Sequence, residues 1–221
     1  MSRIAEDRCL KGERIHMTRE VSTMPSTFRI PKAPITGLYG TFLKLYAKRF
    51  LGGEFPDNGY VYFHHKDVLR SVLSFEGKVD KWDRLDPNLK SYAQLASAGV
   101  IGCSWCLDFG YFKAHNDGLD LAKVREVPRW RESEVFTALE RDVLEYAEAM
   151  TVTPLTVTDE MVANLLEKLG APAVVELTQM IALENMRSRF NSAAGLQSQG
   201  YSDVCELPLA ASSEPSGTHA T

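Results

Sequence analysis

The chain has 221 residues, of which 44% are hydrophobic and 24% charged, and its formal net charge is -4. This length allows one large domain, and the apolar content is sufficient for a buried core, which excludes a disordered chain. The charge balance lacks the basic excess that neutralises phosphates, so nucleic-acid binding is not expected. No run approaches the roughly 18 apolar residues of a transmembrane helix. The mixed charges of residues 1–20 match neither a secretory signal nor a typical transit peptide, so we expect a cytoplasmic protein.

Residues 1–83 are expected to form an N-terminal extension with an irregular start followed by two helices. A long helix is excluded near the start by three prolines, Pro25, Pro31 and Pro34. Over residues 37–51 apolar side chains recur at helical spacing, at Leu38, Phe42, Leu45 and Tyr46. Two glycines end this helix, a turn cluster at 54–60 follows, and the second helix is expected over 66–75. The longest stretch with a strand pattern is 60–63.

The centre of the chain predicts two successive helices joined at a glycine. Asp86 is expected to cap the first helix, because a proline follows it in the first turn. The apolar stripe of this helix consists of Leu89, Tyr92, Ala93, Ala96 and Val100. Gly102 interrupts the pattern, and the second helix begins at Cys103 and extends to about His115.

Four further helical segments are predicted after this pair, over residues 119–127, 134–150, 158–169 and 172–194. The last 14 residues are rich in Ser, Pro and Thr, so residues 197–221 are expected to form a flexible C-terminal tail. The predicted fold class is therefore all-α.

Two of the four cysteines form a close pair, Cys103 and Cys106, while Cys9 and Cys205 are isolated. A helix N-terminus presents unpaired N–H groups and partial positive charge, and both stabilise a thiolate. A thiolate that attacks a peroxide becomes a sulfenic acid, a neighbouring cysteine can then close a disulfide, and a thiol reductant reopens it. A structural zinc site would require a second pair of ligands, which the sequence does not offer. A serious alternative is that Cys103 and Cys106 are simply small residues buried in the core.

The segments around this pair resemble a known family. They are residues 85–90 (LDPNLK), 101–109 (IGCSWCLDF), 130–133 (WRES), 147–151 (AEAMT), 157–160 (VTDE) and 175–178 (VELT). In order and spacing, residues 84–196 are similar to the carboxymuconolactone decarboxylase-like family, which includes alkylhydroperoxidase D.

The resemblance implies an alkylhydroperoxidase-like helical bundle with a central helical hairpin, formed by residues 84–196. It also implies a homotrimer or hexamer in which neighbouring subunits complete the site. Several members of the family reduce peroxides without a cofactor or a metal. By their pattern Cys106 would attack the peroxide and Cys103 would resolve the product, with a thiol reductant as partner.

The sequence departs from the peroxidase pattern at the positions of its proton relay. Ser91 and Gly110 stand where the pattern has a glutamate and a histidine, and Trp105 stands where some members carry a further histidine. The side chains that usually deprotonate the nucleophile quickly are therefore absent from these positions.

Three other histidines are candidates to replace the relay. His115 lies nine positions after Cys106, which places it on the opposite face of a helix with about 3.6 residues per turn. His64 or His65 could approach from another helix or subunit, although ordinary surface histidines are the more frequent case.

The sequence is compatible with two other functions. The decarboxylase branch of the family acts on a small carboxylated lactone without a cofactor, but that branch lacks the cysteine pair. Its anionic substrate would need a positive group, for which Arg187 and Arg189 are candidates, although a solvated helix face is the more frequent role of such residues.

A non-catalytic member is the third possibility, with the cysteines packed in the core and a role in binding or assembly. Aromatic residues near the pair would then line an apolar pocket or simply fill the core: Trp105, Phe109, Tyr111 and Phe112. Among the three functions, we predict a thiol-dependent oxidoreductase that acts on peroxides or disulfides as small-molecule substrates.

Overall fold

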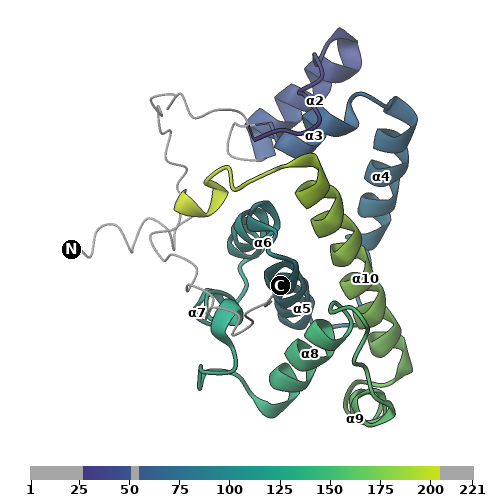
Figure 1. Cartoon of the computed structure of the whole chain (residues 1–221), viewed down its shortest axis with the longest axis vertical. Helices are drawn as coiled ribbons and strands as arrows, with labels where there is room; N and C mark the ends of the chain where they lie inside the picture. The colour runs from purple at the N-terminus through teal and green to yellow at the C-terminus, as the bar shows by residue number, and fades with distance from the viewer. Residues whose placement is uncertain (1–26, 51–54, 205–221) are drawn as a thin grey trace, which may run out of the picture.

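The computed structural model describes residues 27–50 and 55–204, and all regular secondary structure in these ranges is helical (Figure 1). This confirms the predicted all-α class. Within the same ranges, no helix combines the length and the apolar character needed to cross a bilayer. Cys9 and Cys205 lie outside the described residues.

Helix α5 (Pro87–Ile101) is the central helix, and it packs against α6 (Ser104–Asn116), α8 (Ala138–Ala149) and α10 (Ala171–Ala194). The Asp86 carboxylate accepts hydrogen bonds from the N–H groups at the start of α5, as the sequence predicts for an N-cap. Side chains on all sides of α5 are buried, which a helix enclosed by three others requires.

Gly102 joins α5 to α6 and forms the turn of the central hairpin. Its φ of 75° lies in the left-handed region, which glycine adopts without steric cost. The backbone reverses there, so that α6 packs back against α5.

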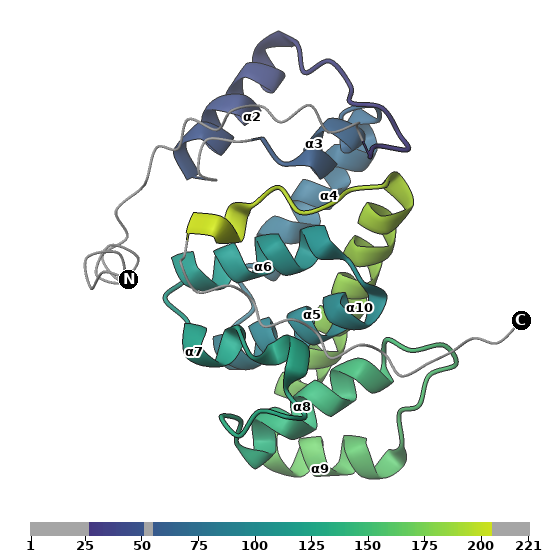
Figure 2. The same cartoon turned by 60° about the vertical axis from the view of Figure 1, so that its left-hand side comes forward.

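The segment after α6 packs mainly on α5. It contains α7 (Leu121–Val124), the short 3₁₀ helix η1 (Val127–Arg129), α8 and α9 (Asp159–Leu169). Helix α8 begins at a complete capping box between Thr137 and Glu140. Helix α10 then runs back along the bundle, so that α8 and α9 lie near one end and α2 to α4 near the other (Figure 2).

The N-terminal part contains three described helices, α2 (Gly37–Phe50), α3 (Asp57–Tyr62) and α4 (Lys66–Val79), and not the two that the sequence predicts. The prediction of a turn at 54–60 and of a strand pattern at 60–63 is wrong for α3. This helix is fixed by contacts distant in sequence: the ring of Tyr62 stacks on that of Phe190 in α10, with centroids 4.2 Å apart.

Helix α2 carries its predicted apolar stripe on the outside. Leu38 is 94% exposed, and Phe42 and Leu45 are 62% and 65% exposed. The periodicity therefore predicts the helix correctly, but it does not identify a face buried within this chain.

The first part of the predicted C-terminal tail is held in place, which corrects the expectation of a flexible segment from residue 197. Residues 197–204 lie against α6 and end in the 3₁₀ helix η2 (Tyr201–Val204). The Asp108 carboxylate of α6 accepts hydrogen bonds from four consecutive backbone N–H groups, those of Gln199, Gly200, Tyr201 and Ser202. The remainder of the predicted tail lies outside the described residues.

Candidate functional site

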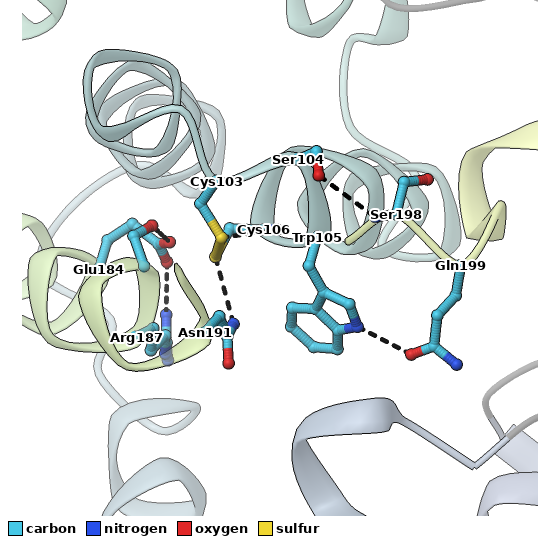
Figure 3. Close-up of a disulfide and its surroundings, with 10 residues drawn as sticks. Cys103, Ser104, Trp105, Cys106, Glu184, Arg187, Asn191, Ser198 and Gln199 are labelled. Carbon is cyan, nitrogen blue, oxygen red and sulfur yellow. Dashed lines mark hydrogen bonds and ion pairs between the residues drawn. A yellow bond between two sulfur atoms is a disulfide. The ribbon is translucent and has the colours of Figure 1, made fainter. Parts of the chain in front are cut away.

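Cys103 and Cys106 are joined by a disulfide at the start of α6 (Figure 3). Cys103 is the N-cap residue, and its Sγ accepts a hydrogen bond of 3.2 Å from the N–H of Cys106. The Cα atoms lie 5.3 Å apart, and the residues are only 2% and 7% exposed. The predicted pair therefore occupies the helix start, where N–H groups and the helix dipole favour a thiolate when the pair is reduced.

The side chain that contacts the sulfur of Cys106 belongs to α10. Asn191 donates a hydrogen bond from Nδ2 to Cys106 Sγ over 3.3 Å, and it is 1% exposed. A donor aimed at this sulfur stabilises its charged form after reduction. Sequence spacing does not connect Asn191 with Cys106, because 85 residues separate them.

Two further polar residues lie on the same face of α10. Glu184 and Ser188 are buried, and Ser188 Oγ donates a hydrogen bond of 2.7 Å to Glu184 Oε1. Figure 3 shows Glu184 and Asn191 on the side of α10 that faces the disulfide. The available signal was a polar residue at each of three successive helical turns in an otherwise apolar face, at Glu184, Ser188 and Asn191.

An ion cluster surrounds Glu184. Arg187 donates two hydrogen bonds to the Glu76 carboxylate of α4, the Nε bond measuring 2.8 Å, and one longer bond of 3.3 Å to Glu184 Oε2. Burial raises the pKa of Glu184 above its ordinary value, and the nearby Arg187 charge only partly offsets this effect.

These contacts correct the sequence interpretation of Arg187. It is neither on a solvated face nor a free anion-binding group, since its guanidinium is mostly buried and pairs with two carboxylates. Arg189 is exposed and donates a hydrogen bond to the backbone oxygen of Thr151.

The three relay positions of the peroxidase pattern hold no proton carrier. Ser91 is buried in α5. A Cβ at Gly110 would lie 2.9 Å from Leu95 Cδ2, so the close packing of α5 on α6 leaves no space for a histidine without a shift of Leu95. Trp105 donates its indole N–H to Gln199 Oε1 over 2.8 Å, and its ring faces away from the disulfide (Figure 3).

The three histidines that could replace the relay lie or bind elsewhere. His115 lies in the last turn of α6, at the opposite end from the cysteines. The Nε2 atom of His64 lies 2.7 Å from the backbone oxygen of Pro31, and His65 caps α4 by accepting a hydrogen bond from the N–H of Val68.

The aromatic residues near the pair pack as core. Trp105 stacks on Phe109 with centroids 4.9 Å apart, and Tyr201 of η2 contacts both Phe109 and Phe112. Tyr111 belongs to a separate buried cluster between the central helices. The predicted alternative of simple core filling therefore describes these rings, and Tyr201 packs against two of them.

Known proteins resemble this chain over the same region. A family model described as the carboxymuconolactone decarboxylase family matches residues 66–149, from the start of α4 to the end of α8. The uncharacterised protein YnjA of Escherichia coli (strain K12) is 38% identical over 142 residues, which cover 64% of this chain and 76% of YnjA.

Two solved structures share the fold. The debrominase Bmp8 in its apo form superposes with a TM-score of 0.65 at 19% identity, and covers 75% of this chain and 89% of its own. A protein of Agrobacterium tumefaciens that carries the provisional name antioxidant defence protein AhpD has a TM-score of 0.58 at 22% identity. It covers 62% of this chain and 94% of its own. Together with the family match and the relative, these similarities confirm the predicted resemblance: the chain belongs to the carboxymuconolactone decarboxylase family.

Proposed function

We propose that the protein is a thiol-dependent oxidoreductase that reduces small-molecule peroxides or disulfides through Cys103 and Cys106. The observation that carries this proposal is the joined cysteine pair at the start of α6, with the Asn191 amide donating to the sulfur of Cys106. A pair that only filled the core would need neither a helix start nor a polar partner across the bundle.

The peroxide reaction follows from thiol chemistry. The Cys106 thiolate attacks one oxygen of a hydroperoxide, so that an S–O bond forms, the O–O bond breaks and the leaving oxygen takes a proton to become an alcohol. The Cys103 thiol then attacks the sulfenic acid, which forms the disulfide and releases water. A dithiol reductant restores both thiols and becomes a disulfide itself. A reducing cytoplasm, which we expect from the sequence, would supply this reductant.

The relatives leave the substrate class open. One structural neighbour carries a provisional antioxidant name and another is named a debrominase, and identities of 22% and 19% to this chain establish the fold alone. The decarboxylase function is less well supported, since it makes no use of the cysteine pair and Arg187 is already paired with two carboxylates.

Mass spectrometry of the whole protein tests the proposal. The reduced chain is treated with hydrogen peroxide or an alkyl hydroperoxide, remaining thiols are blocked, and the state of each cysteine is determined. We expect a Cys103–Cys106 disulfide, consumption of the peroxide in the presence of a dithiol, and loss of both in Cys106→Ser. Cys9→Ser and Cys205→Ser are the matched controls and should behave as wild type.

Two outcomes contradict the proposal. One is a reduced pair that survives peroxide unchanged in the native protein. The other is a turnover of carboxylated substrate that persists when both cysteines are replaced by serine, which would favour the decarboxylase function.

The homotrimer or hexamer implied by the family is likewise a proposal. Light scattering coupled to gel filtration gives the mass directly. A monomer at all concentrations would contradict a site completed by neighbouring subunits.

A further inference from the structure

A row of buried polar side chains extends along α10 and ends at the disulfide. Its members are Glu184, Ser188 and Asn191, which are 6%, 0% and 1% exposed. They are spaced four and three residues apart, the spacing that keeps side chains on one helix face. Each end of the row makes its own hydrogen bond: Asn191 donates to Cys106 Sγ, and Ser188 donates to Glu184.

The ion cluster beside this row holds two carboxyl groups for one guanidinium. Glu76 takes both strong hydrogen bonds from Arg187, whereas Glu184 receives one bond of 3.3 Å. The side chain of Glu184 is also the more buried, at 8% exposed against 28% for Glu76. A buried carboxylate without a full counter-ion is costly, so Glu184 is the carboxyl of this cluster that readily binds a proton.

The other groups that face Glu184 do not exchange protons in the neutral range. Arg187 keeps its charge, since hydrogen bonds and charge pairing with the two glutamates raise its pKa despite burial. From α3, Tyr62 adjoins Glu76 and Arg187, and burial raises its pKa to about 12, so its phenol stays neutral. Ser188 and Asn191 carry no ionisable group in this range.

We propose that Glu184 is the proton carrier of the Cys103–Cys106 couple and occupies the role that Ser91 and Gly110 cannot fill. Its carboxyl comes from α10, the helix whose Asn191 donates to Cys106 Sγ, and Figure 3 shows it on the side of that helix toward the disulfide. The inference rests on the proposed function only in that the pair must alternate between disulfide and dithiol.

The proton balance is as follows. The thiolate of a dithiol reductant attacks one sulfur of the pair, so that a mixed disulfide forms and the bond between Cys103 and Cys106 breaks. The cysteine thiolate that leaves takes the proton of Glu184. The second thiol of the reductant then attacks the mixed disulfide and forms the reductant disulfide. The other cysteine leaves and takes the proton of the attacking thiol. In the next oxidation the Glu184 carboxylate accepts the proton of the Cys106 thiol and passes it to the oxygen that leaves the peroxide. The carboxylate then takes up the proton that the reductant thiol released on ionising, so Glu184 is protonated again before the following reduction.

Reduction kinetics test this role without any peroxide. The oxidised full-length protein is reduced with dithiothreitol over a range of pH, and each rate is divided by the fraction of reductant thiolate. For wild type we expect this corrected rate to fall as Glu184 loses its proton. In Glu184→Gln we expect a rate about tenfold lower at low pH, with no such fall.

Glu176→Gln is the matched control. Glu176 lies on the same helix, is 6% exposed and pairs with Lys90, but it belongs to neither the row nor the cluster around Glu184. It should keep the wild-type rate and pH profile. Equal profiles for wild type and folded Glu184→Gln would overturn the proposal, because a purely structural carboxyl would leave the pH dependence unchanged.

A second measurement uses the wild-type chain, in case Glu184→Gln does not fold. Carboxyl NMR of protein with labelled glutamate follows the titration of Glu184 in the disulfide and dithiol states. We expect different midpoints in the two states, since the carrier and the thiol interact. The same midpoint in both states overturns the proposal for Glu184 alone, whereas a pair that no thiol can reduce would contradict the proposed function itself.

Discussion

Asn191 in the last helix donates a hydrogen bond from its side-chain amide to Sγ of Cys106, 3.3 Å away. This contact places a neutral donor beside the sulfur, whereas the relay positions Ser91 and Gly110 hold neither the glutamate nor the histidine of the peroxidase pattern. A neutral donor stabilises a thiolate but cannot take its proton. Asn191 and Glu184 therefore offer two separable contributions to one cysteine.

Replacement of Asn191 by leucine should disfavour the Cys106 thiolate, because a hydrogen bond to a charged group contributes about 1.5 to 3 kcal/mol. The reduced protein should then react with iodoacetamide about tenfold more slowly near neutral pH. Asn185→Leu is the control, since Asn185 lies on the same helix but donates to Thr151. Unchanged alkylation of Asn191→Leu would show that the amide does not assist ionisation.

Replacement of Asp108 by asparagine should release the segment that covers α6. The carboxylate accepts hydrogen bonds from four backbone N–H groups and from the Ser202 hydroxyl, whereas an asparagine directs an NH₂ group at some of these donors. We expect a loss of about 2 to 4 kcal/mol in the free energy of unfolding and faster proteolysis within residues 197–204. Asp117→Asn, at the exposed end of the same helix, should change stability by less than about 0.5 kcal/mol. Protection of the segment in Asp108→Asn would contradict its anchoring role.

The stability of the protein should depend on pH with opposite signs at two glutamates. Burial raises the pKa of Glu184, so its neutral form favours the fold below its ordinary pKa of 4.5, and this contribution is lost as pH rises through the higher folded value. Glu184→Gln should therefore gain stability relative to wild type as pH rises.

The opposite change is expected at Glu140. Burial acts to raise the pKa of this carboxyl, but hydrogen bonds from Lys123 and Thr137 outweigh it and lower the pKa below 4.5. The Glu140 carboxylate therefore stabilises the fold above its ordinary pKa of 4.5, and this stabilisation is lost as pH falls through the lower pKa of the folded state. Glu140→Gln should therefore be less stable than wild type near neutral pH, and this difference in the free energy of unfolding should shrink in acid. Urea denaturation from pH 3.5 to 8 measures both variants, and differences that do not vary with pH would contradict both assignments.

Alanine should have opposite effects at two helical glycines. A Cβ at Gly99 meets no atom within 4 Å, so Gly99→Ala should stabilise the protein by up to about 1 kcal/mol through helix propensity. A Cβ at Gly110 would approach Leu95 to 2.9 Å, so Gly110→Ala should be less stable than wild type by about 1 kcal/mol. Thermal denaturation measures both. In a Leu95→Val background the penalty at Gly110 should decrease, and an unchanged penalty would show that Leu95 is not its cause.

The sequence alone predicted the helices whose signals are local. Asp86 and Gly102 mark helix ends at which capping groups and turns act over a few residues, and the structure has helix ends at both. The family was also accessible from the sequence, because several short segments keep a fixed order and spacing. Local signals failed at α3, whose turn-forming residues are held as a helix by its packing on α10.

The sequence by itself determined the helical pattern, the cysteine pair and the absence of the usual relay at Ser91 and Gly110. Only the tertiary structure showed that Asn191 contacts Cys106, that Glu184 shares Arg187 with Glu76, and that Asp108 holds the start of the expected tail. Each of these relationships joins residues far apart in the chain or depends on which helix face is buried. Periodicity specifies that a helix has a face, but the packing of all helices together decides what that face meets.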